Sequence, residues 1–324
     1  MKLFHKLLIP VIVTILLVSF IGCGEDKLSA DEKGIRIKVI VKKRDASFWT
    51  VVKMGAEAAG KEFGVNIDFN GPIDEQDIDL QIEMVDGAIR EKADAIVLAA
   101  CDYTKLVNVA EKAVSEGIPV IIIDSDIHSA KMNSFIGTNN VDAGKLLAET
   151  LIEEVEENSK IAVMSFVKGA ASSDQRDEGL YDVLGNYSSV EIVESMYCYS
   201  DESVAEKLTK ELVRQYPDVD AIVCTNAYGT VGTARAISQL DLAGKVKIIG
   251  FDSTPEEVSF VEKGVIQSLV VQNPFSMGYL GVKYALNAIN KETFPKLIYT
   301  ESKVINKSNM YQPENQKLVF PFTD

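Results

Sequence analysis

Short runs of β-branched residues alternate along this chain with longer amphipathic segments, and this alternation constrains the fold more than any other feature. The clearest run covers residues 120–123, which follow the helix-breaking Gly117 and Pro119 and end abruptly at Asp124. Such an unbroken run is typical of a strand buried on both faces of a parallel sheet. The pattern therefore predicts an α/β fold of parallel strands joined through helices.

The alternation forms two successive series, and the second begins at Asn139 and Asn140. Strands are expected at 35–41, 65–69, 95–98, 120–123, 160–165, 190–196, 221–224 and 246–251, and a further short run lies at 134–137. Helices are expected at 48–63, 74–92, 103–116, 141–155, 174–184, 202–216 and 228–240. The tail adds a strand at 268–271, a helix at 275–290 and a strand at 303–306. Two series predict two similar, doubly wound parallel-sheet lobes.

The N-terminus is expected to lie outside this fold. Lys2 and Lys6 precede an apolar run, 7–20, that is short for a membrane span, and the run leads to Gly22 and Cys23. This resembles a bacterial lipoprotein signal, so we expect cleavage of residues 1–22 and lipidation of Cys23. The alternative is an uncleaved anchor helix. In both cases the folded part lies outside the cytoplasmic membrane, with residues 23–34 as a polar tether.

Charge and composition exclude several kinds of function. The formal net charge is -15, and loss of Lys2 and Lys6 with the leader makes it more negative, so nucleic acid is not an expected partner. Only His5 and His128 are present, which argues against a histidine-rich metal site, and no cofactor is expected. With Cys23 lipidated, three cysteines remain, and this odd number argues against a complete set of disulfides.

Polar side chains follow several of the predicted strands at the point where each strand ends. Asp124, Asn226, Asp252 and Gln272 occupy such positions. In open parallel sheets, ligands bind just beyond the carboxyl ends of the strands. Carboxylates and amides accept hydroxyl hydrogens, so this set suits a polyol. Each residue also has a simpler explanation, because aspartate and asparagine often cap helices and turns.

Three further residues extend this set. Arg176 lies near the start of a helix, and Phe48 and Trp49 open the first helix; Trp49 is the only tryptophan. Arginine donates hydrogen bonds, and aromatic faces cover the C–H faces of sugar rings. The alternatives are a surface position for Arg176 and core packing for Trp49.

Taken together, these residues give the chain a resemblance to the ribose-type periplasmic sugar-binding proteins, which are subunits of ABC transporters and share a fold with LacI-type repressors. The resemblance covers roughly residues 35–310. It rests on these segments: Ser47-Phe48-Trp49 with Gly55-Ala56, residues 118–124, Gln175-Arg176 with Glu178-Gly179, Pro217-Asp218-Val219 through Asn226, Gly250-Phe251-Asp252 with Thr254-Pro255, and Val271-Gln272. It implies ligand contacts from Phe48, Trp49, Asp124, Arg176, Asn226, Asp252 and Gln272.

Two departures from the ribose-type pattern argue against ribose itself as the ligand. Ala46 stands where the family has an asparagine, and Ser125 stands where it has an arginine. The neighbouring Asp45 is therefore added to the expected ligand contacts.

The resemblance also implies three crossings between the lobes, near Thr138-Asn139, Gln272-Asn273 and Ser302. Lobe 1 would comprise 35–138 and 273–302, and lobe 2 would comprise 139–272 and 303–324.

The resulting expectation is a monomeric, lipid-anchored solute-binding protein. It would capture a monosaccharide or related polyol for an ABC permease. The main alternative is a sensor that presents the ligand to a membrane receptor or histidine kinase. An enzyme using Asp124 and Asp252 as a glycosidase pair is a third possibility. A repressor is disfavoured by the leader and the charge.

Overall fold

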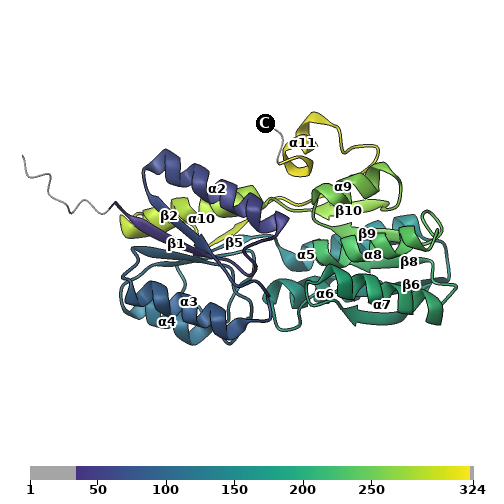
Figure 1. Cartoon of the computed structure of the whole chain (residues 1–324), viewed down its shortest axis with the longest axis horizontal. Coiled ribbons are helices and arrows are strands. Elements are labelled where there is room, and N and C mark those ends of the chain that lie inside the picture. The colour runs from purple at the N-terminus through teal and green to yellow at the C-terminus, as the bar shows by residue number, and fades with distance from the viewer. Residues whose placement is uncertain (1–33, 322–324) are drawn as a thin grey trace, which may run out of the picture. The chain divides into compact units, whose positions relative to one another are not determined.

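The computed structural model of this chain describes residues 34–321. The predictions for the leader, for residues 23–33 of the tether and for Cys23 lie outside the described residues. The described chain folds into two six-stranded sheets, each with helices packed on its two faces (Figure 1). The predicted class, two doubly wound α/β lobes, is confirmed. We call sheet A with its helices the first lobe and sheet B with its helices the second lobe.

Sheet A is entirely parallel, and its last strand comes from far along the chain. Its strands are β1 (Arg36–Ile40), β2 (Asn66–Asn70), β3 (Ala95–Leu98), β4 (Val120–Ile123), β5 (Ser134–Gly137) and β11 (Leu297–Tyr299). They lie in the order β11-β5-β4-β3-β1-β2. This order places the ends of β1 and β4 on either side of β3, so the residues that follow them lie at the same edge.

Side chains of the central strands of sheet A alternate between two apolar layers. Val120 and Ile122 pack with α3 (Ile78–Arg90) and α4 (Val107–Ser115). Ile121 and Ile123 pack on the opposite face. That face is covered by α2 (Ser47–Phe63) and α10 (Pro274–Ile289), as Figure 1 shows. Burial on both faces explains why these strands are continuous β-branched runs.

Sheet B repeats this plan with one antiparallel strand. Its strands are β6 (Ser159–Ser165), β7 (Val190–Tyr197), β8 (Ala221–Cys224), β9 (Lys247–Phe251), β10 (Ser268–Val271) and β12 (Lys303–Asn306). They lie in the order β12-β10-β9-β8-β6-β7, and β12 runs antiparallel to β10. The associated helices are α5 (Asn140–Glu154), α6 (Ala171–Leu184), α7 (Glu202–Gln215), α8 (Ala227–Gln239), α9 (Pro255–Glu262) and α11 (Pro313–Val319).

Several sequence-based boundaries were wrong, and short elements were missed. Helix α3 begins at Ile78 because Asp77 caps it by accepting a hydrogen bond from the backbone of Leu80, so residues 74–77 form a turn. Helix α4 likewise begins at Val107, four residues late. The elements α9, α11 and β11 were not predicted, because three to eight residues give too little periodicity to recognise.

Glycines let two pairs of helices approach until their backbones touch. A Cβ added at Gly278 of α10 would lie 1.9 Å from the Val52 carbonyl oxygen of α2. In the second lobe, a Cβ at Gly144 of α5 would lie 2.1 Å from the carbonyl oxygen of Arg176 on α6. Since the opposing atoms are backbone, they cannot move aside cheaply. The α5–α6 contact therefore fixes the helix that carries Arg176.

We expect Gly278→Ala to destabilise the protein by about 1–3 kcal/mol, because the added methyl group overlaps the Val52 carbonyl. Denaturant unfolding followed by circular dichroism measures this change. Gly87→Ala in α3 is the matched control, since its Cβ would meet only the end of Arg90 at 3.7 Å. There, alanine should stabilise the helix by about 0.5–1 kcal/mol. Equal unfolding midpoints for the two variants would contradict the close-contact interpretation.

Candidate functional site

A small cavity lies where the carboxyl ends of strands from both sheets come together. Its empty space, counted to the solvent at its mouth, is about 350 Å³. Seven of the eight ligand contacts expected from the sequence line it. The lining residues are Lys42, Phe48, Trp49, Glu75, Asp124, Phe166, Ser172, Arg176, Asn226, Ala227, Tyr228, Asp252 and Gln272.

Asp124 and Asp252 hold equivalent positions in the two lobes. Each directly follows a buried strand, and each has a left-handed backbone, with φ of 58° and 82° respectively. That conformation strains a residue with a side chain by about 1–3 kcal/mol and is concentrated at functional sites. Both carboxylates are buried. These features favour a ligand role over that of an ordinary turn aspartate.

Lys42 is a buried cation that the sequence reasoning missed. One residue, Val41, separates Lys42 from the end of β1. The Lys42 ammonium lies 3.4 Å from Oδ2 of Asp124 and 3.8 Å from Oε2 of Glu75. It also donates a hydrogen bond to Ser172 Oγ at 3.2 Å. Burial disfavours the charged form, but the two carboxylates outweigh it and raise the pKa of Lys42. Lys42 is therefore a cation in the cavity wall.

Arg176 is buried in the second lobe and is not a surface residue. Its guanidinium donates to Asn140 Oδ1 at 2.9 Å and to the Thr225 carbonyl at 2.8 Å. It also lies over the Phe251 ring, 3.8 Å from the centroid. Burial lowers the pKa of Arg176, although nearby carboxylates including Asp252 act in the opposite direction. These contacts hold the guanidinium in one orientation beside the cavity.

A chain of hydrogen bonds links Asp252 to the segments that pass between the sheets. Gln272 Nε2 donates to Asp252 Oδ1 at 2.7 Å, and Thr138 Oγ1 donates to Gln272 Oε1 at 2.7 Å. The backbone N–H of Ala227 donates to the other oxygen of Asp252 at 3.2 Å. Gln272 thus combines a position in the cavity wall with a hydrogen bond to the first lobe.

Asn226 lines the cavity and also caps α8. Its Oδ1 accepts a hydrogen bond from the Gly229 N–H at 2.9 Å, and its Nδ2 donates to Ser200 Oγ at 3.2 Å. Helix capping and ligand contact, which the sequence presented as alternatives, are therefore compatible.

Aromatic side chains provide the apolar part of the wall. Phe48 and Trp49 pack edge to face with centroids 4.9 Å apart. Trp49 is 2% exposed and belongs to the apolar core of the first lobe while lining the cavity. Core packing and ligand contact are again compatible for this residue.

Two buried oxygen atoms in the cavity wall lack hydrogen bonds within the described part of the chain. They are Oδ2 of Asp124, which has only its ionic contact with Lys42, and the hydroxyl of Tyr228. Buried polar atoms normally have a partner. These two atoms are available to a ligand that carries hydroxyl groups.

Asp45 is the expected contact that the structure places elsewhere. Its side chain is 68% exposed, pairs with Arg44 at 3.1 Å and is absent from the cavity wall. It lines a larger, neighbouring opening that also contains Phe48 and Tyr228. The expectation that Asp45 replaces the missing amide at position 46 is not supported by this placement. Lys42 and Glu75 are the charged residues that the first lobe adds instead.

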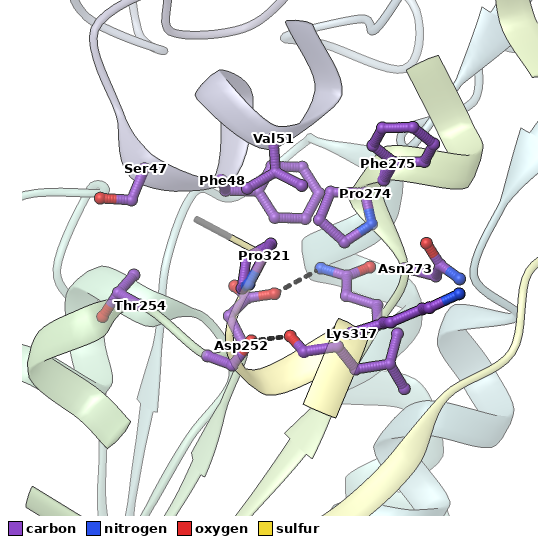
Figure 2. Close-up of a pocket in the computed structure, with 13 residues that line it drawn as sticks. Ser47, Phe48, Val51, Asp252, Thr254, Asn273, Pro274, Phe275, Lys317 and Pro321 are labelled. Carbon is purple, nitrogen blue, oxygen red and sulfur yellow. Dashed lines mark hydrogen bonds between the residues drawn. The ribbon is translucent and has the colours of Figure 1, made fainter. Parts of the chain in front are cut away.

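A second cavity, of about 420 Å³, adjoins the first and shares Phe48, Asp252 and Gln272 with it. Figure 2 shows its wall, which is formed by the start of α2, the start of α10 and the segment that ends at Pro321. Half of the added residues are apolar: Val51, Pro274, Phe275, Leu318 and Pro321. The first cavity is the better candidate site, because the buried charged residues Lys42, Glu75, Asp124 and Arg176 line it and not the second.

Two parallel-sheet lobes with a polar cavity at the carboxyl ends of their strands define the class of two-lobed solute-binding proteins. The chain belongs to the periplasmic binding protein domain family, whose pattern it matches over residues 37–293.

Individual proteins support this assignment. The chain is 37% identical to an ABC transporter solute-binding protein from Agrobacterium vitis, solved with bound D-fucose; the match covers 88% of this chain and 100% of that one, with a TM-score of 0.86. A carbohydrate transporter solute-binding protein from Agrobacterium radiobacter, in complex with D-arabinose, is 30% identical over 89% of this chain and 99% of its own, with a TM-score of 0.85. The D-allose-binding periplasmic protein of Escherichia coli (strain K12) is 26% identical over 77% of this chain and 83% of its own.

Two features are absent from residues 34–321. No helix in this part of the chain is long and apolar enough to span a membrane. Nor does this part contain three or more His, Cys, Asp or Glu side chains grouped to hold a metal ion. Cys101, Cys198 and Cys224 are buried and unpaired.

Glu257 is a further buried carboxylate, and it lies near enough to Asp252 to be affected by its charge. It lies in the first turn of α9, where Oε2 accepts a hydrogen bond from the Thr254 N–H at 2.6 Å. Its Oε1 is buried without a hydrogen bond within the described chain. Burial, and then the charge of Asp252, raise the pKa of Glu257 well above its ordinary value.

This raised pKa predicts a pH-dependent stability. The folded state holds the Glu257 proton more tightly than the unfolded state does. The stability that this proton contributes is therefore full below the ordinary pKa of about 4.3 and is lost as pH rises toward the folded-state pKa. Glu257→Gln removes this titration. We expect the free energy of unfolding of the variant, relative to wild type, to be higher at about pH 8 than at about pH 5. Denaturant melts at both pH values measure it, and the exposed Glu211→Gln should show no such trend. A constant difference for Glu257→Gln would contradict the prediction.

Proposed function

We propose that this protein binds a neutral monosaccharide or related polyol between its lobes and delivers it to an ABC-type permease. The cavity wall is the observation that carries the proposal. Asp124, Asp252 and Glu75 can accept hydroxyl hydrogens, while Arg176 and Lys42 can donate. The aromatic side chains can cover the C–H faces of a sugar ring.

The similar proteins support a sugar of five or six carbons. Two of them were solved with D-fucose and with D-arabinose, and a third is named for D-allose. All three match most of this chain's length. We therefore propose that the ligand of this protein is also a monosaccharide, and a binding experiment would identify which one.

We further propose that the bound molecule is released unchanged. The family is one of binding proteins, and the two aspartates are held in place by neighbours. Asp252 accepts hydrogen bonds from Gln272 and Ala227, and Asp124 faces the Lys42 ammonium. Recovery of the intact sugar after long incubation would support binding without catalysis.

The lobe boundaries are also a proposal: 35–138 with 273–302, and 139–272 with 303–324. In support, sheet A draws its strands from 36–137 and 297–299, and sheet B from 159–271 and 303–306. The three connecting segments, near Thr138, Gln272 and Ser302, would act as hinges for opening and closure.

Isothermal titration against aldopentoses, aldohexoses, 6-deoxyhexoses and polyols tests the proposed function. We expect at least one neutral sugar to bind and the corresponding sugar acids to bind far more weakly. The reason is that three carboxylates and two cations line the cavity, so an added anion lacks a partner. Absence of binding by every neutral sugar would overturn the proposal.

Asp124→Asn should weaken binding of the sugar found in this way by about 1–3 kcal/mol, which is about five- to 150-fold. The substitution keeps the shape but removes the charge that faces Lys42. Asp45→Asn is the matched variant, because this carboxylate lies outside the cavity wall. Isothermal titration of both variants with the sugar measures these effects. A larger loss of affinity in Asp45→Asn would contradict the assignment of Asp124 as a ligand contact.

We propose that the protein is a monomer held outside the cytoplasmic membrane by lipid on Cys23. The basic start, the short apolar run and Gly22-Cys23 support this. In cells, Cys23→Ala should abolish incorporation of labelled fatty acid and shift the protein out of the membrane fraction, with sugar binding retained. Cys101→Ala is the control. Unchanged fatty-acid labelling of Cys23→Ala would exclude the anchor.

A further inference from the structure

Hydrogen bonds from both lobes converge on Ser200, a residue outside the cavity wall. Ser200 Oγ donates to Glu75 Oε2 of the first lobe at 3.0 Å and accepts from Asn226 Nδ2 of its own lobe at 3.2 Å. Its carbonyl oxygen accepts a hydrogen bond from Lys43 Nζ of the first lobe at 3.0 Å. Glu75 and Asn226 both line the sugar cavity. Ser200 therefore connects two cavity residues that stand on opposite lobes.

The backbone at Ser200 is strained in a way that favours glycine, yet the chain keeps a side chain there. Tyr199 and Ser200 have consecutive positive φ angles, 54° and 53°. They form the reversal between β7 and α7, in which the Asp201 N–H donates to the Cys198 carbonyl. Ser200 is 1% exposed, whereas Tyr199 is largely exposed. Strain retained at a buried, hydrogen-bonded hydroxyl points to a role for that hydroxyl.

The charges around Ser200 explain why this contact is strong. Glu75 also faces the Lys42 ammonium at 3.8 Å, and the Lys43 ammonium lies 4.3 Å from the centre of the Tyr228 ring. Both bonds to the first lobe therefore involve a charged group, which makes them stronger than bonds between neutral groups. Separation of the lobes would break both, while the bond to Asn226 within the second lobe would remain.

We propose that Ser200 is a positioning residue that holds the lobes closed over the bound molecule and sets how long that molecule stays. This inference rests on the proposed function for the ligand, but the contact itself is a property of the protein alone. Ser200 acts through Glu75 and Asn226 and does not touch the ligand. Its loss should therefore act mainly on dissociation, which requires opening, and little on association.

Stopped-flow fluorescence tests the proposal, because Trp49 is the only tryptophan and lines the cavity. With the sugar identified by titration, Ser200→Ala should raise the dissociation rate about tenfold or more, as expected for loss of a hydrogen bond to a charged group. The association rate should change much less. An unchanged dissociation rate would overturn the proposal.

Two further variants separate this role from general damage to the fold. Lys43→Met removes the other bond to Ser200 from the first lobe and should also raise the dissociation rate. If Ser200→Ala does not fold, Lys43→Met alone tests the proposal. An unchanged dissociation rate in Lys43→Met would then overturn it. Ser203→Ala, an exposed serine three residues away, is the control and should bind as wild type does.

A measurement without ligand distinguishes failure of this proposal from failure of the proposed function. If wild type binds no sugar, the proposed function fails, and acrylamide quenching of Trp49 in the free protein decides the role of Ser200. Trp49 is almost fully buried in this closed arrangement. Ser200→Ala should increase its quenching, since the lobes would open more often. Equal quenching in the two proteins would then overturn the proposal.

Discussion

The burial of charge in the cavity wall is the constraint on which the rest of this structure depends. Two cations and three carboxylates line one buried cavity, where an unpaired charge would be severely disfavoured. Each is tolerated because another group faces it. Lys42 lies between Asp124 and Glu75, and Asp252 accepts two hydrogen bonds. These pairs join different elements of one lobe, so each half of the cavity wall requires the strands and loops of its own lobe to be placed accurately.

The fold supplies this accuracy through its backbone. Parallel strands bring their carboxyl ends to one edge, and the chain then turns sharply at Asp124 and Asp252 with positive φ angles. Close contacts at glycines hold the covering helices, and the contact at Gly144 lies against the Arg176 carbonyl itself. Helix packing and the orientation of a cavity cation are therefore determined by the same backbone contact.

Much of the fold could be predicted from the sequence because its central strands are buried on both faces. The runs at 95–98, 120–123, 221–224 and 268–271 match observed strands residue for residue. Elements at the periphery lacked that signal: β11 has three residues, and two of them are exposed. Helix α9 could have been recognised from Thr254, Pro255 and Glu257, which form a capping box with proline at the first position.

The candidate site was predictable where it follows strands and less so elsewhere. Asp124, Asn226, Asp252 and Gln272 came from the strand-end rule, which would also have indicated Lys42. Arg176 lies on a helix, where the strand-end rule does not apply, and the family resemblance strengthened its selection. Glu75 lies in the loop between β2 and α3, and its position depends on tertiary contacts with Lys42 and Ser200 that no local pattern encodes.

The path of the chain also affects the order in which the molecule can form. Sheet A receives β11 and the covering helix α10 only after the chain has built most of sheet B, and sheet B receives β12 last. Helix α10 supplies Met277, Val282 and Ala285 to the core of the first lobe. During synthesis, neither lobe can bury its full core until nearly the whole polypeptide has left the ribosome. A nascent chain of this design stays incompletely folded for longer than one whose domains follow each other in sequence.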